Sequence, residues 1–144
     1  MSAQRRVITL RLDGARYGVD VEQVQEVLRE AEITPVPLAP RSVAGLLNLR
    51  GRIVTALDLR RCLGLPERPP GHHTVNLVVT VADNPVSLLA DEVGEVVELS
   101  VSEIQPRPET AHGPQAAALS AVATDDHGLL LLLDVARVMT AGGV

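Results

Sequence analysis

The residues of this 144-residue chain that could carry out chemistry are one cysteine, four histidines and a number of carboxylates. Cys62 stands among the apolar residues of a short predicted helix, where a buried, unreactive thiol is expected rather than a nucleophile with a base in reach. His72 and His73 are adjacent, so their side chains point in different directions and make a poor metal-binding pair. His112 and His127 each lie beside a glycine, as solvated loop histidines do.

The carboxylates offer no clearer catalytic arrangement. Asp125 and Asp126 precede Gly128 and are typical of a hairpin turn, so we do not expect them to form an acid–base pair. Neither a glycine-rich dinucleotide-binding motif nor a P-loop pattern occurs in the sequence. We therefore expect no catalytic residues, no metal and no cofactor, that is, a protein that is not an enzyme. A small enzyme that uses Cys62 or the two adjacent histidines is a remote alternative.

Arg50 is the residue whose position most needs an explanation. It lies in the stretch NLRGRIVTALDL, between apolar runs at 43–49 and 53–57 that are predicted to form a tight hairpin. Gly51 permits the positive φ that such a turn often needs, and Asn48 tolerates turn geometry well. The hairpin is therefore expected to place a guanidinium at its mouth.

A guanidinium in this apolar setting must reach water or pair with a carboxylate, because an unpaired buried charge is very costly. Glu26, on a stretch expected to be helical, is the predicted partner of Arg50. A solvated turn arginine with no particular role is the alternative interpretation.

Composition narrows the class of protein. Hydrophobic residues make up 46% of the chain and are nearly all Val, Leu, Ile and Ala, with one Tyr and no Phe or Trp. The β-branched valines favour strands. The net charge of −5 and the lack of stacking aromatics argue against nucleic-acid binding. The single cysteine suits a reducing compartment, and no apolar run is long enough to insert into a membrane. We expect a cytoplasmic protein.

The first half of the chain is predicted to consist of short strands and one helical piece. Residues 6–12 alternate apolar and polar side chains, as a half-buried strand does, and Asp13-Gly14 is a strong hairpin signal. Residues 21–28 place apolar side chains at helical spacing, which predicts one or two amphipathic helical turns. Residues 33–40 form a proline-rich connector that can be neither a helix interior nor a central strand.

Helix signals and a second hairpin follow. Asp58 can cap a short helix that Gly64 can end. Residues 66–73 are proline-rich and are expected to form a surface loop at the boundary between two halves. Beyond that loop, residues 75–81 and 86–90 flank a turn and predict another hairpin.

The second half repeats landmarks of the first, at an offset of roughly 70 to 76 residues, which suggests an internal repeat. About five short strands in each half can close into a small barrel and so remove exposed edges. We expect two barrels side by side with a groove between them, in one domain over residues 1–144. The first barrel would cover about 15–65 and the second about 74–133, with terminal segments crossing between or flanking them. The matched pairs are Glu22–Val27 with Asp91–Val96, Ile33–Pro37 with Ile104–Pro108, and Ala56–Leu63 with Leu132–Met139.

Three segments, YGVDVEQVQEV, ITPVPLAPRSVAGLLNLRGRIVTALDLRRCLG and VSLLADEVGEVVELSVSEIQPRP, resemble the CheW family of chemotaxis coupling proteins. The pattern runs from about Arg6 to Met139, and the NLRG turn followed by an apolar strand and DLR is its most specific part. The resemblance implies a mostly β fold of two SH3-like five-stranded barrels with a few short helices. It also implies a cytoplasmic scaffold, associated with membrane receptor arrays, that couples chemoreceptor signalling tips to the regulatory domain of a CheA-type histidine kinase.

The resemblance further implies which residues act. The groove between the barrels takes the receptor's helical hairpin, and Arg50, held by Glu26, would lie where the barrels meet. The positions on the groove side are Val24, Glu26, Gly45, Asn48, Arg50 and Gly51. Asp91 and Val93 match the family's D-x-V element and are expected, with Asp58, to be structural. The residues that contact the kinase stay open, as does the alternative of a coupling module in a non-chemotactic receptor–kinase system such as surface motility. Thr55-Ala56 departs from the family pattern, in which a proline often stands there.

Overall fold

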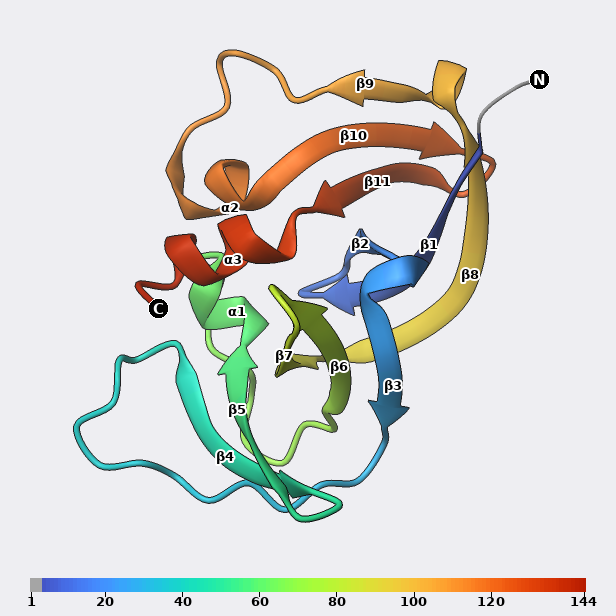
Figure 1. Cartoon of the computed structure of the whole chain (residues 1–144). Helices are drawn as coiled ribbons and strands as arrows, with labels where there is room; N and C mark the ends of the chain where they lie inside the picture. The colour runs from blue at the N-terminus through green and yellow to red at the C-terminus, as the bar shows by residue number, and fades with distance from the viewer. Residues whose placement is uncertain (1–3) are drawn as a thin grey trace.

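The protein consists of two mostly antiparallel β-sheets (Figure 1). We describe residues 4–144 from a computed structural model. One sheet has five strands in the order β3-β6-β7-β5-β4, and the other has six in the order β8-β1-β2-β11-β10-β9. The mostly β fold of two subdomains predicted from the sequence is thus confirmed. The five-stranded sheet contains β3 (Val24–Leu28), β4 (Val43–Leu49), β5 (Arg52–Asp58), β6 (Val75–Val81) and β7 (Asn84–Ala90). The six-stranded sheet contains β1 (Gln4–Leu12), β2 (Ala15–Asp20), β8 (Glu92–Ser100), β9 (Ile104–Pro106), β10 (Leu119–Asp125) and β11 (Gly128–Leu133).

The predicted hairpins form where turn residues allow positive φ. Asp13 and Gly14, between β1 and β2, have φ values of 50° and 82°. Ala82 and Asp83, between β6 and β7, have φ values of 49° and 66°. Two consecutive residues with positive φ match a type I′ turn, whose twist suits the flanking strands.

The division of strands between the sheets differs from the expected one. The hairpin of β6 and β7 was expected in the second barrel, but it completes the five-stranded sheet. There β6 pairs with β3, and β7 runs parallel to β5, with Thr55 opposite Val86. Conversely, β1 and β2 belong to the six-stranded sheet, through β8 and β11. The expected boundaries of 15–65 and 74–133 followed the order of strands in the sequence. In the structure each sheet includes a hairpin from the other half of the chain: β6–β7 in the five-stranded sheet and β1–β2 in the six-stranded sheet.

The stretch at 21–28 is another correction. Only Val21–Gln23 is helical, as the 3₁₀ helix η1, and the residues after it form β3. Their apolar side chains fit a helical spacing, but backbone pairing with β6 determines the structure. The spacing of apolar residues predicts secondary structure poorly where the segment can form backbone hydrogen bonds with a neighbouring strand.

Short helices occupy the junction between the two sheets (Figure 1). Asp58 caps α1 by accepting a hydrogen bond from the Arg60 backbone, and Asp134 caps α3 by accepting one from Arg137. The same strand–aspartate–helix arrangement therefore occurs in both halves, as the repeated landmarks predicted. The helices at the junction are α1 (Leu59–Cys62), α2 (Gly113–Ala118) and α3 (Val135–Ala141), whereas the 3₁₀ helix η2 (Val101–Glu103) lies between β8 and β9.

The core extends across the junction between the sheets. Its largest cluster includes Leu10 and Tyr17 from the six-stranded sheet, Leu57 and Leu88 from the five-stranded sheet, and Val138 from α3. A smaller cluster lies within each sheet alone. The two subdomains therefore share buried apolar surface, whose removal from water holds them together.

Candidate functional site

The NLRG motif forms the turn between β4 and β5. Leu49 pairs with Arg52, which leaves Arg50 and Gly51 as a two-residue loop with φ values of 51° and 85°. The Asn48 side chain accepts a hydrogen bond from the Gly51 backbone at 2.7 Å. The predicted hairpin is confirmed, and its asparagine and glycine hold the arginine in an outward-pointing turn.

Arg50 pairs with Glu26, as expected from the sequence. Its guanidinium donates through both terminal nitrogens to both carboxylate oxygens, with an Nη1–Oε2 distance of 3.1 Å. The hydrogen bond from Arg50 lowers the pKa of Glu26, and the one to Glu26 raises the pKa of Arg50. The Arg50 side chain is 67% exposed, so the pair lies on the surface and not in a buried hairpin mouth.

The pair lies elsewhere than predicted. Glu26 is on strand β3, not on a helix, and β3 and β4 are the two outer strands of the five-stranded sheet. The turn that carries Arg50 lies at the end of this subdomain remote from β9 and β10, not at the junction of the two subdomains (Figure 1). The ion pair thus joins β3, one outer strand, to the β4–β5 hairpin, which contains the other outer strand, β4. It therefore helps to bring the two edges of the sheet together.

Gly45 closes the same sheet by a different contact. Thr34, in the segment after β3, pairs with Leu46 through two backbone hydrogen bonds of 2.8 Å. A Cβ atom at position 45 would lie 2.3 Å from the Thr34 carbonyl oxygen. Only glycine fits there, so Gly45 is needed by the close approach of two backbones.

Val24 and Val93 are partly buried and pack against the large core cluster. Val24 begins β3 opposite Val79, and Val93 pairs with Leu10 in β1. The predicted groove-side residues thus lie on one subdomain, around β3 and the β4–β5 hairpin. Within this set, Glu26 and Arg50 are joined by their ion pair.

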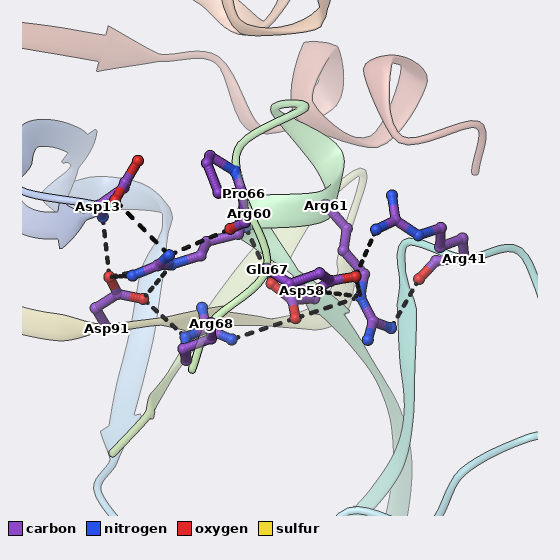
Figure 2. Close-up of polar contacts among 9 residues, drawn as sticks. All are labelled: Asp13, Arg41, Asp58, Arg60, Arg61, Pro66, Glu67, Arg68 and Asp91. Atoms are coloured by element: carbon purple, nitrogen blue, oxygen red, sulfur yellow. Dashed lines mark hydrogen bonds and ion pairs between the residues drawn. The ribbon is translucent and has the colours of Figure 1, made fainter. Parts of the chain in front are cut away.

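A second charged cluster, which sequence reasoning missed, surrounds Asp91 (Figure 2). Asp91 lies between β7 and β8, where the chain passes from one sheet to the other. Its Oδ2 accepts from Arg60 Nη2 at 2.6 Å and from the Asp13 backbone at 2.9 Å, and its Oδ1 accepts from Arg68 Nε at 2.8 Å. Arg68 also donates to Asp58 at 3.2 Å. The cluster therefore connects α1, the β1–β2 turn and the proline-rich loop.

These charges are removed from water and compensate one another. The side chains of Arg60, Arg68 and Asp91 are only 7%, 9% and 12% exposed. Burial alone would raise the pKa of Asp91, but the hydrogen bonds from Arg60, the Asp13 backbone and Arg68 outweigh it and lower the pKa to about 2. Desolvating a carboxylate and two arginines costs free energy, and removing one member of the cluster costs more, because it leaves the others without a partner.

The loop at 66–73 was expected to be a plain surface loop, and the buried Arg68 is the exception. Pro66 before Arg68, and Pro69, Pro70 and Gly71 after it, predicted exposure, and nothing in the local pattern signals burial. A further pair that sequence reasoning missed joins Arg16 on β2 to Asp125 at the end of β10, at 2.8 Å and 2.9 Å. The hydrogen bond from Arg16, against the opposing effect of burial, lowers the pKa of Asp125 to about 2.

The residues considered for chemistry are dispersed. Cys62 is fully buried in the core, and burial raises the pKa of its thiol to about 11. His72 and His73 are exposed in the proline-rich loop, while His112 precedes α2 and His127 is in the β10–β11 turn. Within residues 4–144, no three metal-binding side chains come together. In the same range, no helix has both the length and the apolar character needed to cross a bilayer.

The fold defines this chain as a mostly β protein of two subdomains with a few short helices. It belongs to the CheW family: the family model described as CheW-like domain matches residues 6–142, nearly the whole chain.

Proteins of known identity agree with this assignment. The chain is 27% identical to chemotaxis protein CheW of Bacillus subtilis, covering 93% of this chain and 86% of that protein. It is 33% identical to chemotaxis protein CheW of Rhizobium meliloti, covering 74% of this chain and 69% of that protein. Protein FrzA of Myxococcus xanthus is 31% identical, covering 73% of this chain and 66% of that protein. The crystal structure of scaffolding protein TtCheW from Thermoanaerobacter tengcongensis superposes with a TM-score of 0.84 at 25% identity, covering 92% of this chain and 90% of that one.

Proposed function

We propose that this protein is a cytoplasmic adaptor that couples chemoreceptor signalling tips to the regulatory domain of a CheA-type histidine kinase. The observation that carries the proposal is the CheW-like match over residues 6–142. The likeness to a structure described as a scaffolding protein supports it. An adaptor acts by holding partners together and needs no turnover.

The receptor is proposed to bind on the surface of β3 and the β4–β5 turn. Glu26 and Arg50 are the charged contacts there, since a helical partner meets apolar anchors for affinity and charges at the rim for register. Asn48 and Gly51 would position Arg50, and Gly45 would keep β4 in place. Val24 would support β3 from beneath, because it is partly buried.

The experiment is a binding titration of the whole chain against a kinase regulatory-domain fragment and a receptor-tip fragment, separately and together. The proposal expects binding to each fragment and a complex of all three. A known CheW protein that binds both fragments is the positive control. If the control binds and this chain fails to bind one or both fragments, the proposal is contradicted.

A second candidate is the same role in a non-chemotactic receptor–kinase system, such as surface motility. One relative is named protein FrzA, whereas the others that we report are named chemotaxis protein CheW or scaffolding protein TtCheW. This difference in name is the reason for keeping the second candidate. Deletion of the gene separates the two candidates. Loss of spreading in soft agar with normal movement on a surface supports chemotaxis, and the converse supports the second system.

A further inference from the structure

The end of helix α3 is seated on the opposite subdomain. α3 follows β11 of the six-stranded sheet, and Val135 and Val138 pack in the core cluster that both subdomains share. At the end of the helix, the Gly142 carbonyl accepts a hydrogen bond from the Ser42 hydroxyl at 2.5 Å. Ser42 directly precedes β4 of the five-stranded sheet and is only 4% exposed. This contact therefore ties the subdomains together at a place of its own, apart from the carboxylate of Asp91.

The Ser42 hydroxyl is held in position by its own backbone. The Ser42 carbonyl accepts a hydrogen bond of 2.8 Å from the backbone of Asp58, the residue that caps α1. Asp58 is fixed in turn by the hydrogen bond from Arg68. The donor that meets Gly142 is thus part of the rigid junction of β5 and α1, and the end of α3 docks onto a preformed seat.

Gly142 fits this seat because it lacks a side chain. A Cβ atom at position 142 would lie 2.8 Å from Cys62 Sγ and 3.1 Å from Ser42 Cβ. Its φ of −81° is one that any residue adopts, so space alone requires the glycine here. The backbone of Gly142 therefore lies directly against the sulfur of Cys62, which has no exposed surface while the helix end is seated.

The helix stops at this seat. The Gly143 backbone donates to the Thr140 carbonyl at 3.0 Å and the Val144 backbone donates to the Met139 carbonyl at 2.9 Å. With a φ of 75° at Gly143, these two bonds make a Schellman motif, which ends a helix. The last turn is thereby shaped to present the Gly142 carbonyl to Ser42.

The two ends of α3 are held with unequal strength. Val135 and Val138 are fully buried, whereas Met139 and Ala141 are only partly buried and Thr140 and Gly143 are exposed. Segments with few buried contacts open at a lower free energy than the whole protein, and consecutive glycines flex easily. We propose that residues 139–143 are a latch, which opens and closes on the five-stranded subdomain while the rest of the protein stays folded. Each opening uncovers Cys62, and the latch does not depend on which partners the protein binds.

The slow reaction of Cys62 with excess iodoacetamide at pH 8 measures the opening. Mass spectrometry gives the rate at increasing concentrations of denaturant, all below the unfolding transition. In the unchanged chain the rate should be nearly independent of denaturant, because opening the latch exposes little surface. A reaction that required unfolding of the whole chain would accelerate from the first addition of denaturant.

Two variants loosen the latch from its two sides. Gly142→Ala leaves no space for the seated helix end, so we expect the rate without denaturant to rise about tenfold or more. Ser42→Ala removes the hydrogen bond to Gly142 and should raise the rate about fivefold. Gly128→Ala, in the β10–β11 turn, is the matched control. It meets no atom within 4 Å and strains only a positive φ, so it should lower the global stability but leave this rate within about twofold.

The outcomes decide the proposal. If Cys62 of the unchanged chain reacts only in step with global unfolding, the latch does not open by itself and the proposal is overturned. If Ser42→Ala reacts at the rate of the unchanged chain, the contact with Gly142 does not control access to Cys62, and the proposal fails even where Gly142→Ala does not fold. Equal acceleration by Gly128→Ala would reduce the effect to a loss of global stability, which also overturns it.

Discussion

Asp91 and Arg60 join the two subdomains through a charge-assisted contact, with Arg60 Nη2 lying 2.6 Å from Asp91 Oδ2. Arg60 comes from α1, which follows the five-stranded sheet strand β5, and Asp91 also accepts a hydrogen bond from Asp13 in the β1–β2 turn of the other sheet. A single carboxylate thus receives donors from both halves of the molecule. The relative placement of the two halves, and so of any partners they hold, depends on it.

Replacement of Asp91 by asparagine should therefore destabilise the protein. The change leaves Arg60 and Arg68 buried without their shared carboxylate, at an expected cost of about 3 kcal/mol in the free energy of unfolding. Denaturant unfolding followed by circular dichroism measures it. Asp126→Asn, at an exposed turn position, is the control and should change the stability by less than about 0.5 kcal/mol. Equal stability of the two variants would show that the cluster does not hold the subdomains together.

The same carboxylate should make stability fall at low pH. The pKa of Asp91 is lowered from its ordinary 3.8 to about 2 in the folded protein, so the unfolded chain takes up the proton first. The stabilisation is complete above about pH 4 and is lost as the pH falls through about 2. Partial access of water reduces the contribution to about 1–2 kcal/mol. Asp91→Asn should show a flatter pH dependence between pH 5 and 2 than the unchanged chain, and parallel curves would contradict the assignment.

The sequence predicted the local parts of this fold well. Asp13-Gly14, Arg50-Gly51 and the Asp58 cap are determined by the φ tolerance or the side-chain chemistry of one or two residues, and the structure has them where expected. Glu26 as the partner of Arg50 was also predicted, because an arginine in an apolar setting needs a carboxylate.

What could not be predicted depends on contacts between distant segments. Residues 21–28 fit a helical spacing, and only the pairing of β3 with β6 makes most of them a strand. Arg50 was placed between the subdomains because the order of strands within each sheet was unknown. Arg68 appeared exposed because it lies in a proline-rich loop, while its partners, Asp58 and Asp91, are 10 and 23 residues away in the sequence.

Two glycines of the candidate site should respond very differently to alanine. Gly45→Ala brings a Cβ to 2.3 Å from the Thr34 carbonyl, so β4 and the segment before it must separate. We expect a loss of about 2–3 kcal/mol or more in unfolding free energy. Gly51→Ala meets no atom within 4 Å and carries only backbone strain, so it should cost about 1 kcal/mol. Thermal unfolding of the two variants measures both losses. If Gly51→Ala proved less stable than Gly45→Ala, the close contact with Thr34 would not explain the glycine at position 45.

Charge exchange can distinguish the two roles of the Glu26–Arg50 pair. If the pair serves only to close the sheet, Glu26→Arg combined with Arg50→Glu should restore what either single change removes. Under the proposed receptor contact, the exchange restores stability but not binding, because the partner meets charges of the wrong sign. We expect Arg50→Ala and the exchanged variant to bind the receptor-tip fragment about tenfold more weakly. Full recovery of binding in the exchanged variant would reduce the pair to a structural role.

Alkylation of Cys62 tests the remaining enzymatic alternative. The thiol is buried in the core and burial raises its pKa to about 11, so at pH 8 only about one thiol in a thousand is ionised. Native protein should therefore resist iodoacetamide at pH 8, and protein unfolded in denaturant should react fully within the same time. Mass spectrometry of both samples gives the modified fraction. Because this cysteine is the only one in the chain, rapid modification of native protein would mean an accessible, activated thiol and would reopen the case for catalysis.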